Sequence, residues 1–213
     1  MLTIVLATSN KGKLAELRAL LGDLPIELCS LSEVLPEPPN LPEEGATFEA
    51  NAVFKARTVS QATRMYALAD DSGLEVDVLG GRPGVRSARF AHERATDSEN
   101  NAALLRELEE IEEDARAARF RCVLALASPW DGEVQVVEGV CAGSIARAPR
   151  GSAGFGYDPL FVVSGRNGQA MAELSEAEKN EISHRGRAVR ALRPVLIELL
   201  NARLDETERI SGG

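Results

Sequence analysis

The chain has 213 residues, 44% of them hydrophobic, which is enough to bury the core of one large domain or of two small lobes. Its formal net charge of −9 argues against binding to a nucleic-acid polymer, because proteins that coat nucleic acids are basic overall. The three widely spaced cysteines predict neither a disulfide framework nor a thiolate zinc site, and no apolar run could span a membrane, so we expect a cytoplasmic protein without a membrane partner.

The first predicted elements are a buried strand and an amphipathic helix, joined by a polar loop. Residues 3–7 are apolar and partly β-branched, and leucines then recur at helical spacing between positions 14 and 21. The loop between them differs from the G-x-x-x-x-G-K-[ST] motif at Ala7 and Leu14. A helix N-terminus attracts anions, so the loop is either a phosphate-binding loop or a solvated turn with a capping side chain. Its residues are small and polar or basic: Thr8, Ser9, Asn10, Lys11, Gly12 and Lys13.

The next segments carry two acidic pairs. A proline-rich connection, residues 36–40, precedes Glu43 and Glu44, and Thr47 can cap a helix that continues to about Val59. Residues 65–73, MYALADDSG, are predicted as a strand that runs into a turn. Acids at the end of such a strand lie where α/β sheets bind ligands, and oxygen donors favour Mg²⁺ over zinc. The alternatives are an Asx-turn at residues 70–71 and a solvated loop around residues 43–44.

The second half alternates strands and helices. Residues 77–91 are predicted as a structured loop, and capping boxes begin helices at Thr96 and Ser175. Residues 120–127 and 133–145 predict an antiparallel strand pair, and a further strand follows residues 155–159. The last helix is predicted from Ser183 to Leu204, kinked or broken at Pro194, before a frayed tail at residues 205–213. We therefore predict an α/β protein with a mixed sheet and flanking helices, formed by one domain of two lobes over residues 1–204.

Two further segments could contact a flat, charged ligand. Phe155 to Asp158 contains two of the nine aromatic residues of the chain (six Phe, two Tyr and one Trp), so a base could stack there; the alternative is core packing beside a tight turn. His184 and Arg185 lie close to Lys179 at a predicted helix start and could reach an anion or a base edge; the alternative is solvation of the helix end. Together with the loop and the acidic pairs, these segments suit a nucleoside triphosphate bound with Mg²⁺.

Five segments resemble, in order and spacing, the signature blocks of the inosine triphosphate pyrophosphatase family. They read LATSNKGKLAEL, EEGATFEANAVFKA, ADDSGLEVDVLGGRPGVRSARF, FGYDPLF and EKNEISHRGRA, between Val5 and about Leu192. The resemblance implies an elongated mixed α/β fold with two lobes around an active-site cleft, and a homodimer. It also implies Mg²⁺-dependent hydrolysis of dITP, ITP and XTP to the monophosphate and pyrophosphate, with Mn²⁺ as a possible substitute.

The resemblance also implies roles for particular residues. Asp71 would accept the proton from the attacking water and, with Glu43, hold the metal; the spacing to Gly45 favours Glu43 over Glu44. Lys55 and Lys179 would assist the loop of residues 8–13 in binding the triphosphate. The substrate contacts would also include Ser72, Phe155, Gly156, Tyr157, Asp158, Lys179, His184 and Arg185. Rival interpretations are a nucleotide-sensing module, which would not need the carboxylates, and a phosphomonoesterase, which would release orthophosphate.

Overall fold

The computed structural model describes residues 2–211, with side chains described as far as residue 204. One six-stranded sheet runs through the molecule in the order β2-β1-β3-β4-β5-β6. Its strands are β1 (Leu2–Leu6), β2 (Ile26–Ser30), β3 (Tyr66–Val76), β4 (Ala117–Ala127), β5 (Val134–Ile145) and β6 (Phe161–Val163). The helices are α1 (Lys11–Leu21), α2 (Leu31–Val34), α3 (Phe48–Thr63), α4 (Asp97–Glu107), α5 (Glu176–Ile182) and α6 (His184–Ser211), with short 3₁₀ turns at Asp77–Leu79, Gly84–Arg89, Glu113–Ala115 and Met171–Glu173.

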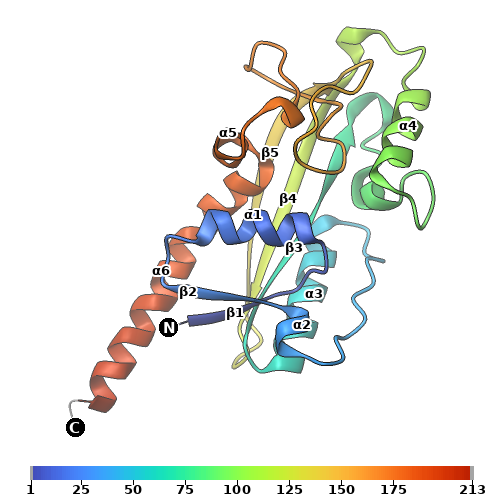
Figure 1. Ribbon diagram of the computed structural model, residues 1–213. Coiled ribbons are helices and arrows are strands. Elements are labelled where there is room, and N and C mark those ends of the chain that lie inside the picture. The colour runs from blue at the N-terminus through green and yellow to red at the C-terminus, as the bar shows by residue number, and fades with distance from the viewer. Residues whose placement is uncertain (1, 212–213) are drawn as a thin grey trace.

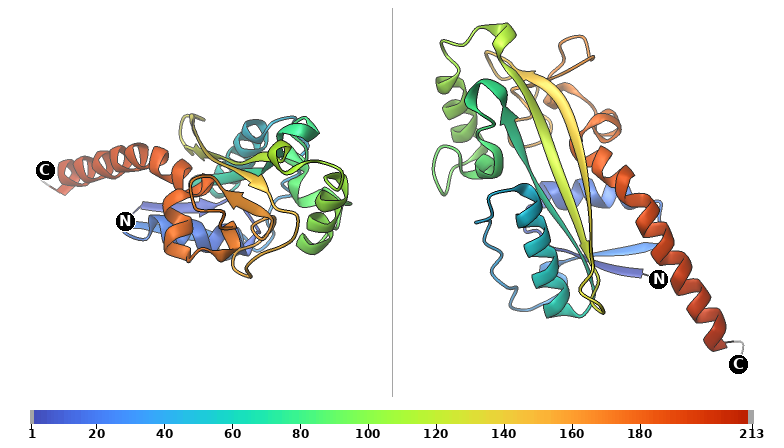
Figure 2. Two further views of the ribbon diagram at one scale, coloured as in Figure 1. Left: turned by 90° about the horizontal axis from the view of Figure 1, so that it is seen from above. Right: turned by 180° about the vertical axis from the view of Figure 1, so that it is seen from behind.

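The sheet is mixed, as predicted. Strands β2, β1 and β3 are parallel, whereas β3, β4, β5 and β6 pair in antiparallel fashion. The long strands β3, β4 and β5 run the length of the molecule, with β1, β2, α1 and α3 around one end and α4 around the other (Figure 1). The molecule is therefore elongated, and α6 projects from it (Figure 2).

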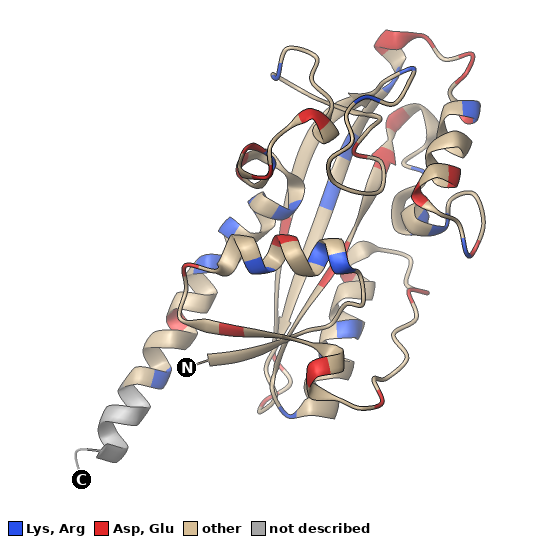
Figure 3. Cartoon of the chain, viewed as in Figure 1, with Lys and Arg blue, Asp and Glu red and all other residues tan. Residues whose placement is uncertain are grey.

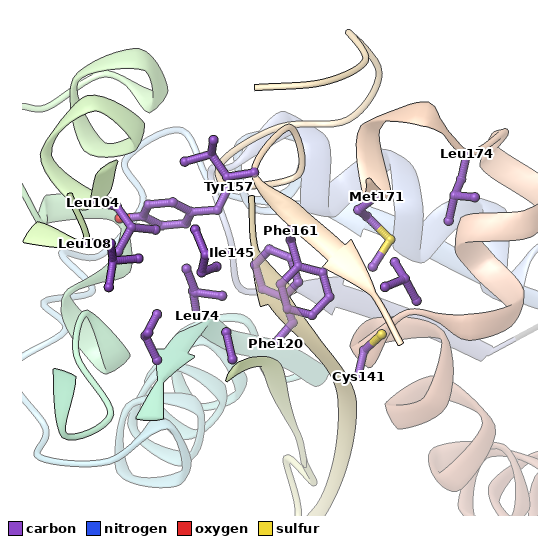
Figure 4. Close-up of a cluster of buried hydrophobic side chains, with 14 residues drawn as sticks. Leu74, Leu104, Leu108, Phe120, Cys141, Ile145, Tyr157, Phe161, Met171 and Leu174 are labelled. Carbon is purple, nitrogen blue, oxygen red and sulfur yellow. The ribbon is translucent and has the colours of Figure 1, made fainter. Parts of the chain in front are cut away.

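Two groups of buried side chains build the first end of the sheet, and another builds the second. At the first end α1 and α6 cover one face through residues such as Leu17 and Leu192, and α3 covers the other through Val59. At the second end Leu104 of α4 and Phe161 of β6 belong to one cluster of buried side chains, in which Tyr157 lies beside Leu104 (Figure 4). The long strands contribute to all three groups, so they carry residues 70–73 between the two ends.

The turn predicted at residues 70–73 is wrong. Strand β3 continues through these residues to Val76, and each of them pairs with a residue of β4. Aspartate and glycine are turn-forming residues locally, but pairing with β4 overrides that preference here. Gly73 serves close packing instead of a turn, because a Cβ atom there would lie 2.3 Å from the Ser87 Oγ atom.

Other differences concern short or terminal elements. The five-residue strand β2 is not among the predicted elements, because it is too short to show a clear period. Helix α6 runs without interruption through Pro194 and continues past Leu204 to Ser211, so Pro194 does not break it. The last two residues of the predicted tail, 212 and 213, lie outside the described residues. No helix within the described part of the chain is long and apolar enough to cross a membrane.

Candidate active site

A cavity of about 310 Å³ lies between the two ends of the sheet, beside residues 71–73 of β3. It is lined by most of the residues predicted for the site: Thr8, Ser9, Asn10, Lys13, Glu43, Lys55, Asp71, Ser72, Phe155, Gly156, Tyr157, Asp158, Lys179, His184 and Arg185. Lys11 and Gly12 do not line it, and Lys11 is exposed. Basic residues of α1 and α3 lie near acidic residues of β3 in this region (Figure 3). Segments far apart in sequence therefore converge on one charged cavity.

The loop between β1 and α1 is both capped and open to an anion. The Asn10 side chain accepts a hydrogen bond from the Lys13 backbone N–H at 3.1 Å, and Thr8 Oγ1 accepts one from the Asn10 N–H at 3.1 Å. The Lys13 ammonium reaches Asp70 Oδ1 at 2.7 Å. Gly12 admits an aromatic ring against the helix start, since a Cβ there would lie 2.7 Å from Phe155 Cδ1. The positive end of α1 and Lys13 thus face the cavity together.

Asp70 organises a network of buried charges. Its carboxylate accepts from Arg185 Nε at 2.7 Å and from the Ser72 hydroxyl at 2.8 Å, besides its contact with Lys13. Burial alone would raise the pKa of Asp70, but Arg185 and Lys13 hold that pKa well below its usual value. Asp70 therefore stays ionised and serves to hold two cations in place.

Asp71 points to the other face of β3, as alternation along a strand requires, and meets a different environment. The Lys55 ammonium donates to Asp71 Oδ1 at 2.7 Å and to Glu43 Oε1 at 2.9 Å, so two carboxylates share one cation. Burial raises the pKa of Asp71 to about 6, with Lys55 opposing this rise and Glu43 adding to it. Partial burial would raise the pKa of Glu43, but the charge and hydrogen bond of Lys55, together with the charge of Lys13, lower it below its usual value. The Asp71 carboxylate, with its pKa of about 6, is suited to accept a proton near neutral pH.

The donor set fits Mg²⁺ better than a softer metal. Glu43 and Asp71 offer carboxylate oxygens that both line the cavity, whereas Glu44 is exposed outside it. Among the side chains that the structure describes, residues 2–204, no group of three or more His, Cys, Asp or Glu is arranged to hold a metal. Mg²⁺ usually takes one or two protein carboxylates and completes its shell with water and substrate phosphates, so this pair is sufficient for it.

Aromatic and basic groups gather at the other side of the cavity. The Phe155 ring centroid lies 4.9 Å from Lys179 Nζ and 5.8 Å from Arg185 Cζ. The His184 ring stacks on Phe120 with centroids 4.8 Å apart and planes tilted by 18°. His184 Nδ1 is buried without a partner, and burial, helped by the Arg185 charge, lowers the pKa of His184 well below its usual value. A neutral imidazole with an unpaired nitrogen can hydrogen-bond the edge of a ligand.

Sequence reasoning missed Glu16. Its carboxylate contacts Lys179 Nζ at 2.6 Å and pairs with Arg185, while Asp158 holds the other side of Lys179 at 2.7 Å. An alternating series of charges therefore joins the Phe155–Asp158 loop to Lys13 through Arg185 and Asp70. The signal in the sequence is spacing, because a residue three positions after Lys13 lies on the same face of α1.

Two further residues lacked any prediction. Asp97, at the first turn of α4, lines the cavity and accepts a hydrogen bond from the Gly156 backbone N–H at 2.7 Å. Asn51, on α3, contacts Asp71 at 3.1 Å from a buried position. Both contacts join elements that are distant in sequence, so no local pattern reports them.

Comparisons with known proteins agree over most of the chain. Residues 4–195 match the Ham1 family. The dITP/XTP pyrophosphatase of Geobacter sulfurreducens is 51% identical over 193 residues, which cover 91% of this chain and 96% of that protein. That of Bacillus licheniformis is 48% identical over 193 residues, covering 91% and 97%. The structure of a HAM1 protein from Coxiella burnetii aligns with a TM-score of 0.82 at 46% identity, covering 93% of this chain and 100% of that one. In sequence and in fold, the chain belongs to the Ham1 family.

Proposed function

We propose that this chain hydrolyses the non-standard purine nucleoside triphosphates dITP, ITP and XTP to the nucleoside monophosphate and pyrophosphate. The observation that carries the proposal is the Asp71 carboxyl, whose pKa is raised to about 6, beside Lys55 in a cavity that also holds the start of α1. The names of the relatives from Geobacter sulfurreducens and Bacillus licheniformis, both dITP/XTP pyrophosphatases, support two of these substrates, dITP and XTP.

The chemistry follows from the placement of charges. A water oxygen attacks the α-phosphorus as Asp71 takes its proton, and the bond from that phosphorus to the bridging oxygen breaks, leaving its electron pair on pyrophosphate. Lys13, Lys55 and the N-terminus of α1 stabilise the charge that develops on the leaving group. Glu43 and Asp71 would hold Mg²⁺, or Mn²⁺ in its place, which neutralises phosphate charge when bound.

The choice of base would follow from hydrogen-bond donors at the aromatic side of the cavity. Hypoxanthine and xanthine carry a carbonyl at position 6, whereas adenine carries an amino group. Arg185 donates hydrogen bonds to Asp70, Glu16 and Ser72, and these contacts fix its guanidinium group beside the neutral His184. The amino group of adenine is a hydrogen-bond donor and would face the N–H donors of this guanidinium without an acceptor. Each unsatisfied buried polar group costs roughly 1–3 kcal/mol. Phe155 would stack on the purine without regard to its identity.

One assay tests the function against its rivals. The protein is incubated with ITP and Mg²⁺, and pyrophosphate is resolved from orthophosphate. Pyrophosphate and IMP are the expected products. Orthophosphate would indicate a phosphomonoesterase, and tight binding of ITP without turnover would indicate a nucleotide-sensing module; either outcome would refute the proposal.

We further propose a cytoplasmic homodimer with no nucleic-acid polymer among its partners. The acidic composition supports the last point. Several large apolar side chains are exposed, among them Trp130 at 73% and Phe54 at 45%, and such side chains are available for a protein interface. Light scattering coupled to size exclusion measures the assembly: a single peak at twice 22.8 kDa is expected, and a monomer across the micromolar range would contradict it.

A further inference from the structure

The Asn51 side chain joins two parts of the site that the backbone does not join. It lies on α3 and is only 2% exposed. Its amide Nδ2 donates to Asp71 Oδ2 at 3.1 Å, and its Oδ1 accepts from the Gly45 backbone N–H at 2.7 Å. Both ends of one short, rigid amide are therefore occupied, one by the candidate base and one by the loop that carries Glu43.

The orientation of this amide admits no alternative. The Gly45 N–H can only donate and the ionised Asp71 carboxylate can only accept, so Oδ1 must face the loop and Nδ2 must face Asp71. Lys55, one turn further along α3, holds the other oxygen of Asp71 at 2.7 Å. Two side chains four residues apart on one helix thus grip both carboxylate oxygens.

We propose that Asn51 is a positioning residue for the hydrolysis, which sets the plane of the Asp71 carboxylate and its distance from the Glu43 loop. The inference rests on the proposed function, since it assigns Asp71 the role of base. Without the Nδ2 donor the carboxylate is held at Oδ1 alone and can turn about that contact. Without the Oδ1 acceptor the loop loses its link to α3 at Gly45, two residues from Glu43.

Gly45 offers an independent way to disturb the same contact. A Cβ atom at this position would lie 2.5 Å from Asn51 Oδ1, closer than such contacts occur, while the loop itself is only partly buried. Gly45→Ala should therefore push the Asn51 amide away from its place without emptying the core. The closest collision needs Asn51 Oδ1 and disappears when Asn51 is shortened to alanine, which leaves the Ala50 Cβ atom at 3.1 Å as the nearest neighbour.

The experiment is a double-mutant cycle on kcat and KM for ITP, with melting temperatures for every variant. Asn51→Ala and Gly45→Ala should each lower kcat by about 10-fold to 100-fold, as expected for a misplaced catalytic group, and leave KM within about threefold. Adding Gly45→Ala to Asn51→Ala should lower kcat by less than about twofold. Equal losses from Gly45→Ala in both backgrounds, or losses confined to KM, would overturn the proposal.

Asn100 provides the matched control. It is equally buried, at 3% exposure, and its amide links the Ala91 N–H at 2.9 Å and the Ala88 carbonyl at 3.1 Å without touching a carboxylate. Asn100→Ala should lower the melting temperature as Asn51→Ala does, yet keep kcat within about threefold. An equal loss of kcat in both would reduce Asn51 to a structural role. A wild-type enzyme that releases no pyrophosphate would refute the function instead, so the two failures are distinguishable.

Discussion

Replacing Asp71 with asparagine should stabilise the fold at neutral pH while it removes activity. Asp71 is 3% exposed, and burial raises its pKa from 3.8 to about 6 despite the attraction of Lys55. The folded chain therefore binds a proton at Asp71 more tightly than the unfolded chain does. Protonation of Asp71 therefore stabilises the folded chain. This stabilisation is fully present below pH 3.8 and is lost as the pH rises through about 6. Above that pH, the ionised carboxylate opposes folding.

The structure sets the size of the effect. The difference between 3.8 and about 6 corresponds to about 3 kcal/mol, since each pKa unit is worth about 1.4 kcal/mol. The asparagine side chain of the variant would lack the charge that attracts Lys55, but Lys55 keeps Glu43 and the Asp70 carbonyl at 2.9 Å each. We therefore expect Asp71→Asn to gain about 1–3 kcal/mol at pH 7.5, or about 2–12 °C in melting temperature for a chain of this size.

Thermal unfolding of the wild type and Asp71→Asn, in buffer with EDTA, measures this gain at pH 7.5 and at pH 4.5. The gain should shrink to about a third at pH 4.5, because the wild-type carboxyl is then protonated in the folded state. Asp114→Asn, at an exposed site, should change the melting temperature by less than about 2 °C. A lower melting temperature for Asp71→Asn at pH 7.5, or a gain independent of pH, would refute the reasoning. The kcat of the Asp71→Asn variant for ITP should fall at least ~10²-fold.

Other predictions concern the metal and the base. EDTA should abolish ITP hydrolysis, and Mg²⁺ or Mn²⁺ should restore it; full turnover in metal-free buffer would contradict the oxygen-donor site. Phe155→Ala should lower kcat/KM for ITP and ATP by similar factors, because stacking on a ring is blind to the base. Arg185→Ala should lower kcat/KM for ITP much more than for ATP; equal losses for ITP, XTP, GTP and ATP would make Arg185 a phosphate contact. Arg185→Ala should also lower the melting temperature, because the buried Asp70 carboxylate loses one of its charged partners.

The sequence predicts most helices and strands and most residues that line the cavity, but not the contacts between distant segments. Apolar periodicity and capping residues suffice to place most helices and strands; the capping boxes at Thr96 and Ser175 are both present. The turn at residues 70–73 fails because local turn preference competes with pairing to β4, which lies about fifty residues away along the chain. Asn51 and Glu16 escape prediction for a similar reason, since their partners Asp71 and Arg185 come from other elements.

Strand β3 places two neighbouring carboxylates in different electrostatic environments, one on each face of the sheet. Asp70 and Asp71 are joined by one peptide bond, yet Arg185 and Lys13 hold the pKa of Asp70 well below its usual value while burial raises the pKa of Asp71 to about 6. The separation depends on register, because β3 pairs with β1 on one side and with β4 on the other. Deleting or inserting a single residue in β3 upstream of Asp70 would turn each carboxylate to the opposite face. We therefore expect any one-residue change in the length of this strand upstream of Asp70 to exchange the environments of the two carboxylates.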